Sequence, residues 1–184
     1  MDNGACSYRH FLEGDENAFS QILEMYRDSL IFFIDRTVHN PDIAEDIAAD
    51  CFAELIVHPR RYNFSVSFKT YLFAIAHHKT VDYIRHKSRY VITEYDDRVV
   101  KSSSYESFEK SVFDKEEARI VNSALEKINS DYREALHLVF FEGQSYEETA
   151  RIMKKSRKQI DNLVYRGKKA LRAILEKEGY EYEK

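Results

Sequence analysis

Two short segments near the C-terminus carry hydrogen-bonding side chains in the spacing of a helix-turn-helix. Ser145 is followed three residues later by Glu148, and Ser156 is followed three residues later by Gln159. Each pair is the signature of a capping box, in which the hydroxyl and the longer side chain satisfy free amides at a helix start. The two starts are eleven residues apart, which leaves room for two helical turns and a tight bend. The second helix of such a pair enters the DNA major groove, so the predicted chemistry is recognition of duplex DNA.

The charge pattern of this segment favours nucleic acid as the partner. Residues 151–172 contain nine Lys and Arg and a single acid, Asp161, for a net charge of +8, whereas the whole chain carries −4. A basic end on an acidic chain indicates a local anion-binding surface, although a charge run can also be a solvated helix face. Residues at the start of the second helix are expected to reach base edges, and later cations to hold phosphates. The predicted duplex-contact set is Ser145, Arg157, Lys158, Gln159, Asp161, Asn162, Tyr165, Arg166, Lys168 and Lys169.

The packing of the two short helices can also be predicted. Ala150 is small where they would cross, and Ile160 and Leu163 would hold the second helix against the first. Lys154 occupies the turn position that often holds Gly, so the turn must accept a residue other than Gly.

Aromatic rings and cations are interleaved in residues 58–89. His58-Pro59 ends one helix and starts a basic, aromatic loop, and a helix from residue 68 to about residue 86 follows. Such a mixture suits single-stranded nucleic acid, because bases stack on rings while cations hold the backbone. Phe68 and Leu72 are expected to be core residues. For Tyr71, a place in the core and a role in stacking on a base both remain open. The predicted aromatic-basic set is Arg60, Arg61, Tyr62, Asn63, Phe64, Tyr71, His78, Lys79, Asp82, Arg85 and Arg89.

A helix that starts at Asn40-Pro41 carries one acidic side. Asn is a good cap, and Pro suits the first helical position. Acids surround two small residues on this side, so a partner could approach closely; an ordinary solvated acidic face is an equally weighted reading. The acidic face consists of Asp42, Glu45, Asp46, Ala49, Asp50 and Ala53.

Metal-dependent catalysis is a weaker interpretation of residues 77–82. His78 and Asp82 are one helical turn apart, and His77 is adjacent, but the sequence offers no third ligand or general base. A polar pair that stabilises the helix explains them as well. Cys6 and Cys51 show no paired spacing, so neither a disulfide framework nor a zinc site is indicated. No cofactor or metal is expected.

The elements that position these residues are predicted to be all helical. Hydrophobic residues make up 43% of the 184 residues, with only five Gly and two Pro. We expect two small helical domains: a helical bundle over 1–89, a flexible linker over 90–113, and a four-helix domain with the helix-turn-helix over 114–184. No apolar run approaches the roughly 18 residues of a membrane span, and residues 1–10 lack a signal pattern. A cytoplasmic protein without membrane insertion is expected.

Three segments together resemble bacterial RNA polymerase sigma factors. Residues 43–52 are similar to the helix that binds the core enzyme, and residues 67–85 to the helix that handles the minus-ten promoter element. Residues 143–171 are similar to region 4, which reads the minus-thirty-five element. Regions 2 and 4 with only a short linker between them resemble the extracytoplasmic-function group.

The resemblance implies a non-enzymatic specificity subunit whose partners are core RNA polymerase and promoter DNA. It assigns polymerase binding to the acidic face, minus-ten recognition and capture of an unstacked non-template base to the aromatic-basic set, and minus-thirty-five recognition to the duplex-contact set. It directs the linker, with Asp96 and Asp97, toward the polymerase active-site channel. An anti-sigma factor is a further partner that the resemblance implies.

Several positions depart from the pattern of the family. Ala49, Tyr71 and His78 stand where relatives often have Gln, Trp and Asn. Asp161-Asn162 replaces a basic-Ser pair, which predicts a departure from the common minus-thirty-five sequence. The alternative function is a stand-alone helix-turn-helix regulator, which would bind its promoter tightly without polymerase.

Overall fold

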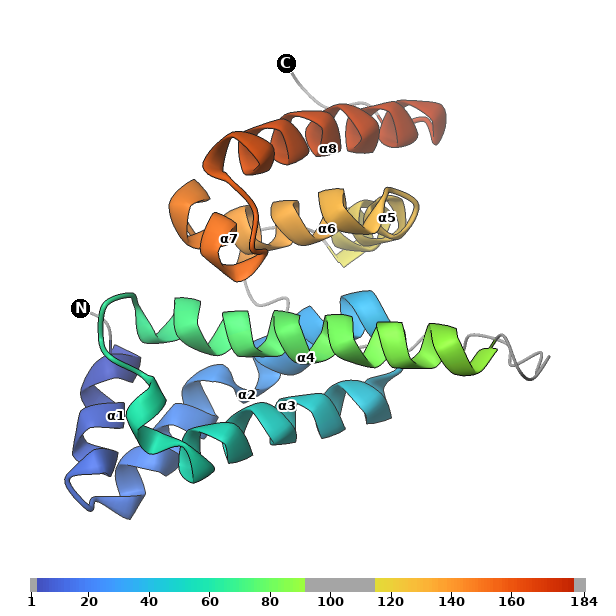
Figure 1. Ribbon diagram of the computed structural model, residues 1–184. Coiled ribbons are helices and arrows are strands. Elements are labelled where there is room, and N and C mark those ends of the chain that lie inside the picture. Colours follow the sequence, from blue (N-terminus) through green and yellow to red (C-terminus); the bar gives the residue numbers. More distant parts are fainter. Residues whose placement is uncertain (1–2, 92–114, 181–184) are drawn as a thin grey trace. The chain divides into compact units, whose positions relative to one another are not determined.

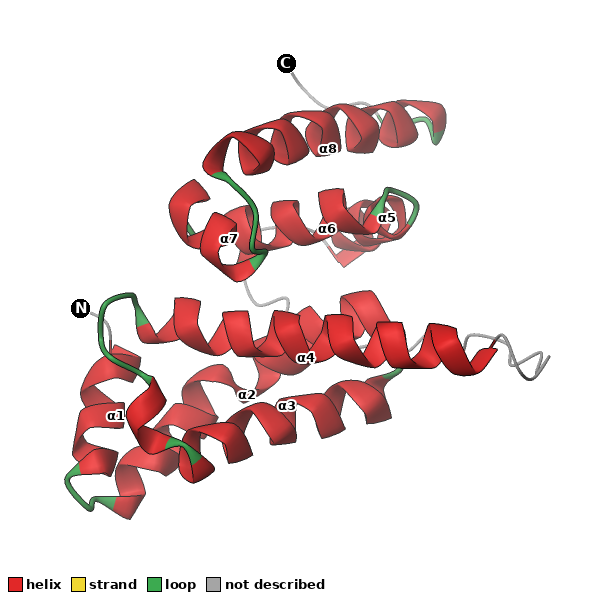
Figure 2. Cartoon of the chain, in the orientation of Figure 1, coloured by secondary structure: helices red, strands yellow, loops and turns green. Residues whose placement is uncertain are grey.

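The computed structural model describes residues 3–91 and 115–180, and the chain divides into two compact units, Met1–Ser104 and Tyr105–Lys184. Within the described residues the regular elements are all helices, which confirms the predicted all-α class with two helical domains (Figures 1 and 2). In those same ranges no helix has the length and apolarity needed to cross a membrane.

Unit 1 begins with two helices, α1 (Asn3–Leu12) and α2 (Glu16–Val38). The α2 helix is capped by Asp15, whose side chain accepts a hydrogen bond from the Asn17 amide at 3.0 Å. The α1 helix was not predicted from the sequence. It packs closely on its neighbours at Gly4, where an added Cβ would lie 2.5 Å from the Tyr26 hydroxyl.

The rest of unit 1 consists of α3 (Pro41–Val57), the short three-ten helix η1 (Pro59–Arg61) and α4 (Phe68–Val91). The predicted Asn40 cap is confirmed, since its side chain accepts from the Ile43 amide at 3.1 Å. The α4 helix runs through residues 90 and 91, so it extends past the predicted start of the linker; residues 92–113, including Asp96 and Asp97, lie outside the described residues. Fully buried side chains from four helices form the core: Tyr8, Ile22, Leu30, Ile34, Leu55, Phe68, Leu72 and Phe73.

Unit 2 contains the predicted four α-helices, α5 (Lys115–Glu126), α6 (Ser130–Leu136), α7 (Tyr146–Ile152) and α8 (Arg157–Lys177). The α6 helix passes directly into the π-helical turn η2 (His137–Phe141). The α8 helix crosses α6 at Gly167, where an added Cβ would lie 3.2 Å from Leu136 and Tyr132 atoms. Buried Leu125, Leu138, Ile152, Ile160 and Val164 form the core.

Candidate nucleic-acid interface

Both predicted capping boxes are present at the starts of α7 and α8. The Ser145 hydroxyl accepts from the Glu148 amide at 3.2 Å, and the Glu148 carboxylate accepts from the Ser145 amide at 2.9 Å. Ser156 and Gln159 repeat the arrangement, with distances of 3.2 and 2.7 Å. Four amide donors at the two helix starts are therefore satisfied locally, and the direction of α8 is fixed from its first turn.

The turn between α7 and α8 has the predicted unusual backbone. Lys154 has a φ of 51°, the left-handed conformation that usually favours Gly. The Lys155 amide donates to the Ala150 carbonyl at 3.0 Å, and its ammonium group lies 3.0 Å from the Asp131 carboxylate on α6. Ala150 and Ile160 are buried, as the predicted helix-turn-helix packing requires, whereas Leu163 is only half-buried.

The predicted duplex-contact set is exposed on unit 2 throughout, including the aromatic Tyr165 at 70% exposure. Four members already have partners, the first of them Ser145 in its capping box. Arg157 Nε lies 2.5 Å from Glu147 Oε1, Lys168 Nζ lies 4.5 Å from the centre of the Phe140 ring, and Gln159 uses its carbonyl oxygen in the capping box. Two-point pairing of Gln159 with adenine would therefore require that capping bond to open.

The loop after η1 is built around a buried ring. Tyr62 is only 3% exposed, its hydroxyl donates to the Val66 carbonyl at 2.8 Å, and its ring stacks on Tyr71 at 5.0 Å and 26°. Tyr62 thus supports the loop in this conformation and does not offer a free face to a base. Phe64 is 37% exposed and has a φ of 60°, a strained conformation for a bulky residue that its surroundings must stabilise.

The unpredicted α1 helix contributes to this loop. The Tyr8 hydroxyl donates to the Leu55 and Pro59 carbonyls at 3.0 and 2.9 Å, which ties the end of α3 to the start of η1. Burial raises the pKa of Tyr8 to about 12. The Arg9 guanidinium lies 5.2 Å from the centre of the Phe64 ring and adds an exposed cation beside the loop.

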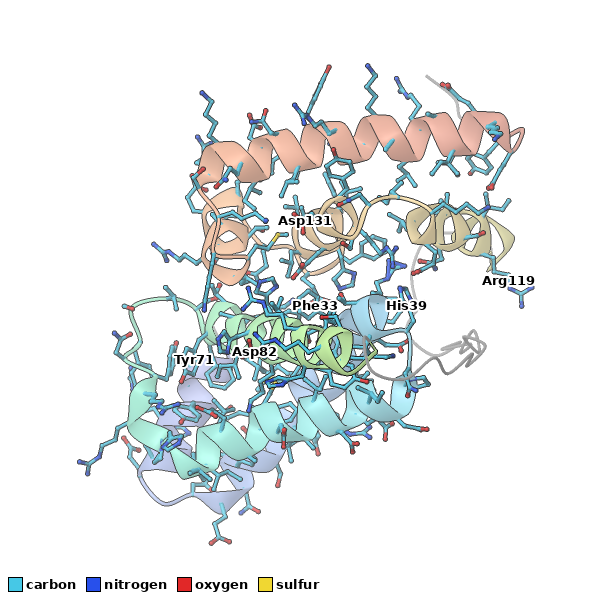
Figure 3. All side chains as sticks on the ribbon, turned by 45° about the vertical axis from the view of Figure 1, so that its right-hand side comes forward. Phe33, His39, Tyr71, Asp82, Arg119 and Asp131 are labelled. Carbon is cyan, nitrogen blue, oxygen red and sulfur yellow. The ribbon has the colours of Figure 1, made fainter. Side chains whose placement is uncertain are left out.

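On α4, three members of the aromatic-basic set form a row in which one acid lies between two basic groups. His78 Nδ1 and Arg85 NH1 lie 3.4 and 3.7 Å from the two Asp82 carboxylate oxygens. Tyr71 and Asp82 both come from this helix (Figure 3), and Arg89 is exposed further along it. Across the described ranges no group of three His, Cys, Asp or Glu side chains is placed to hold a metal ion.

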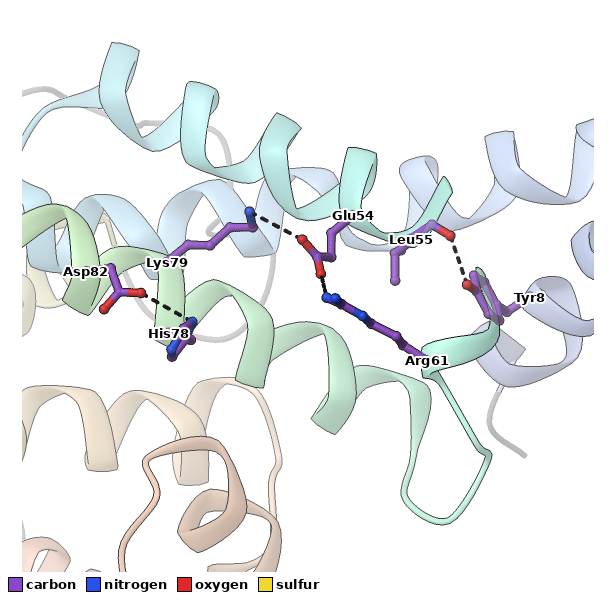
Figure 4. Close-up of polar contacts among 7 residues, drawn as sticks. All are labelled: Tyr8, Glu54, Leu55, Arg61, His78, Lys79 and Asp82. Atoms are coloured by element: carbon purple, nitrogen blue, oxygen red, sulfur yellow. Dashed lines mark hydrogen bonds and ion pairs between the residues drawn. The ribbon is translucent and has the colours of Figure 1, made fainter. Parts of the chain in front are cut away.

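A second acid, Glu54, was missed by the sequence analysis. Its carboxylate forms ion pairs with Arg61 of η1 and, at 3.7 Å, with Lys79 of α4 (Figure 4). Lys79 therefore faces α3. Burial raises the pKa of the nearby Tyr71 hydroxyl; the Glu54 charge also raises it, while the Arg61 charge opposes. The charge pattern of α3 gave no sign of Glu54, because it lies between the buried and acidic sides of the helix.

The acidic face of α3 is exposed at all six predicted positions. Glu45 lies 3.6 Å from Arg27 of α2, whereas Asp42, Asp46 and Asp50 make no ion pair within the described part of the chain. Ile56 and Val57, which are 52% and 67% exposed, extend the last turn of α3 with apolar surface. The helix thus presents acids, two small residues and an apolar end.

Comparison with known proteins gives the family. Residues 22–90 match Sigma-70 region 2, and residues 118–171 match Sigma-70, region 4. The chain therefore belongs to the sigma-70 family of RNA polymerase sigma factors. Within that family, the pairing of these two regions and the similarity to relatives named as ECF sigma factors indicate the extracytoplasmic-function group.

Similar proteins span nearly the whole chain. The ECF RNA polymerase sigma factor SigM of Bacillus subtilis is 24% identical over 155 residues, which are 84% of this chain and 93% of the relative. SigW of the same organism is 26% identical, with 89% and 91% covered. The fold resembles RpoE of Bartonella quintana in complex with the anti-sigma factor NepR (TM-score 0.73, 23% identity, 86% and 96% covered). It also resembles CnrH in complex with the cytosolic domain of CnrY (TM-score 0.64, 21% identity, 95% of each chain covered).

Proposed function

We propose that this protein binds core RNA polymerase and directs it to a specific set of promoters. The observation that carries the proposal is the acidic face of α3, which is exposed at every position although it belongs to a well-packed helix. Asp42, Asp46 and Asp50 have no ion pair within the described residues, so their charges are available to a basic partner. Ala49 and Ala53 allow a partner helix to approach closely, and Ile56 and Val57 add apolar contact area.

The proposal divides promoter recognition between the two units. In unit 2, α8 enters the major groove at the upstream element, with Arg157, Lys158 and Asn162 nearest the base edges and Arg166 and Lys169 on phosphates. In unit 1, Phe64 and Tyr71 stack an unstacked non-template base, and the surrounding basic residues hold its backbone.

The proposal places the protein in the cytoplasm with polymerase and assigns it no catalytic step of its own. It includes an anti-sigma partner that competes with polymerase for the acidic face. This part of the proposal is supported by RpoE, a protein of similar fold whose structure was determined in complex with the anti-sigma factor NepR. The stand-alone regulator is not favoured, since a match to Sigma-70 region 2 covers most of unit 1.

Co-elution with core RNA polymerase tests the proposal. Asp46→Arg with Asp50→Arg reverses the charge at the centre of the acidic face and is expected to abolish the complex. Glu13→Arg with Glu24→Arg is the matched control, because it makes the same change in net charge at exposed positions outside that face. The control should co-elute like the unmodified protein, and circular dichroism should show that both variants are folded.

Two results would contradict the proposal. One is a folded, unmodified protein that does not co-elute with core polymerase at micromolar concentration. The other is equal loss of binding in the α3 variant and its control, because that result would assign the effect to net charge.

A further inference from the structure

Glu54 connects three elements of unit 1. It lies on α3, its side chain is 23% exposed, and each of its carboxylate oxygens pairs with a different cation. Oε1 contacts Arg61 of η1, and Oε2 lies 3.7 Å from Lys79 of α4 (Figure 4). A single, mostly buried carboxylate thus pairs with two basic groups that come from separate elements.

Both cations belong to the aromatic-basic set, and Tyr71 lies within electrostatic reach of the Glu54–Arg61 pair. The Arg61 side chain is 59% exposed and that of Lys79 is 29% exposed, so both can be reached by a phosphate. Because exposed ion pairs are weak, an incoming phosphate can compete with Glu54 for each cation. While both ion pairs are intact, the Glu54 carboxylate cancels one of the positive charges that the aromatic-basic set would otherwise offer to single-stranded DNA.

We infer that Glu54 is a positioning residue that holds Arg61 and Lys79 against α3 and keeps the affinity of the free protein for single-stranded DNA low. This inference rests on the proposed function, because it assumes that these cations face promoter DNA. A sigma factor with such a restraint binds the open strand well only when polymerase holds both partners together, since tethering compensates for the weak intrinsic contact.

Fluorescence anisotropy with a labelled 20-mer of oligodeoxythymidine tests the inference on the full-length free protein. Glu54→Gln removes the charge and is expected to tighten binding about three- to fivefold, the range that releasing two weak ion pairs allows. The slope of the logarithm of affinity against the logarithm of salt concentration should also become steeper by about 0.7 to 1.4. Each newly contacted phosphate contributes about 0.7 to this slope on a single strand. Glu54→Asp retains the charge and should keep the lower affinity.

Glu45→Gln is the matched control, because it makes the same change in charge on the same helix, at a residue paired with Arg27 and not with the loop. It should leave the affinity within twofold of the unmodified protein. The inference is overturned if Glu54→Gln binds no more tightly than Glu45→Gln, binds more weakly, or is matched by Glu54→Asp. A purely structural role for Glu54 predicts weaker binding and a lower melting temperature.

The same preparations, mixed with core polymerase, separate this inference from the proposed function. If the unmodified protein supports promoter-dependent transcription while Glu54→Gln fails to tighten DNA binding, only the inference about Glu54 is wrong. If the unmodified protein supports no transcription, the proposed function itself fails.

Discussion

In unit 2 the cations of α8 project from a helix whose start is fixed by a capping box, whereas in unit 1 Arg61, Lys79 and Arg85 lie beside carboxylates. Lys158, Arg166 and Lys169 of α8 make no ion pair within the described residues. A rigid helix with unpaired cations suits duplex DNA, because the duplex already has its final geometry when the protein binds. A surface with restrained charge suits a strand that opens only after polymerase has bound.

Alkaline pH should separate the two units most strongly. Burial raises the pKa of Tyr8 from 10.0 to about 12 and that of the Cys51 thiol from 9.0 to about 12, and both groups belong to the unit 1 core. Because the folded state favours their neutral forms, their stabilisation is complete below the unfolded pKa values and is lost as pH rises from 9 toward 12. By pH 11 the loss should reach about 3–4 kcal/mol for unit 1. Urea denaturation followed by residue-specific NMR signals measures it, and Tyr8→Phe should remove about 1 kcal/mol of the pH-dependent part.

Arg157→Ala should sharpen the role of unit 2. Arg157 stands at the start of α8, and we expect its loss to cost about 1–3 kcal/mol at one base pair of the upstream element while other positions are read normally. Binding of holoenzyme to a set of promoters with single substitutions in that element measures this. Arg151→Ala is the control, because Arg151 is exposed on α7 outside the duplex-contact set. Uniform weakening across all promoters would show that Arg157 contacts only phosphate.

Ser156→Ala tests whether α8 depends on its cap. The change removes the side-chain acceptor for the Gln159 amide and should lower the free energy of unfolding of unit 2 by about 1 kcal/mol. Thermal unfolding should show the loss in unit 2, with unit 1 unchanged. Ser123→Ala provides the comparison, because Ser123 is exposed within α5 away from a helix start, and it should have little effect.

Lys154→Gly should have the smallest effect, and in the opposite direction. Lys154 adopts a φ of 51°, which Gly accepts without steric cost, so the substitution should stabilise unit 2 by about 0.5–1 kcal/mol. Lys154→Ala removes the same charge but keeps the steric cost, and it should be neutral or slightly destabilising. If both variants change the melting temperature equally, charge and not backbone conformation is responsible.

Local signals predicted most of unit 2. The capping boxes depend on residues that are three positions apart in the sequence. The turn at Lys154 is predicted by its position between two helix starts, so both features could be predicted from the sequence. Helical periodicity likewise predicted the exposed acidic face of α3, because side chains on one side of a helix share one environment.

The parts of unit 1 that were not predicted depend on contacts between distant segments. Tyr8 binds carbonyl groups 47 and 51 residues away in sequence, and only the folded bundle brings them together. Tyr62 was assigned to the DNA surface because rings beside cations suit both a core and a stacking site, and the structure buries it under neighbouring rings. Glu54 acquires its two partners only when η1 and α4 pack on α3. The spacing that predicts helices carries no information about such pairs.

Transcription from a genomic fragment library, with core polymerase and this protein as the added factor, tests the central claim most directly. Sequencing of the transcript starts should reveal a common set of sites that share an upstream and a downstream element, with none of them used by core polymerase alone. The Asp46→Arg, Asp50→Arg variant should lose these starts, while the Glu13→Arg, Glu24→Arg control keeps them. Starts that are the same with and without the folded protein would contradict its assignment as the promoter-specificity subunit.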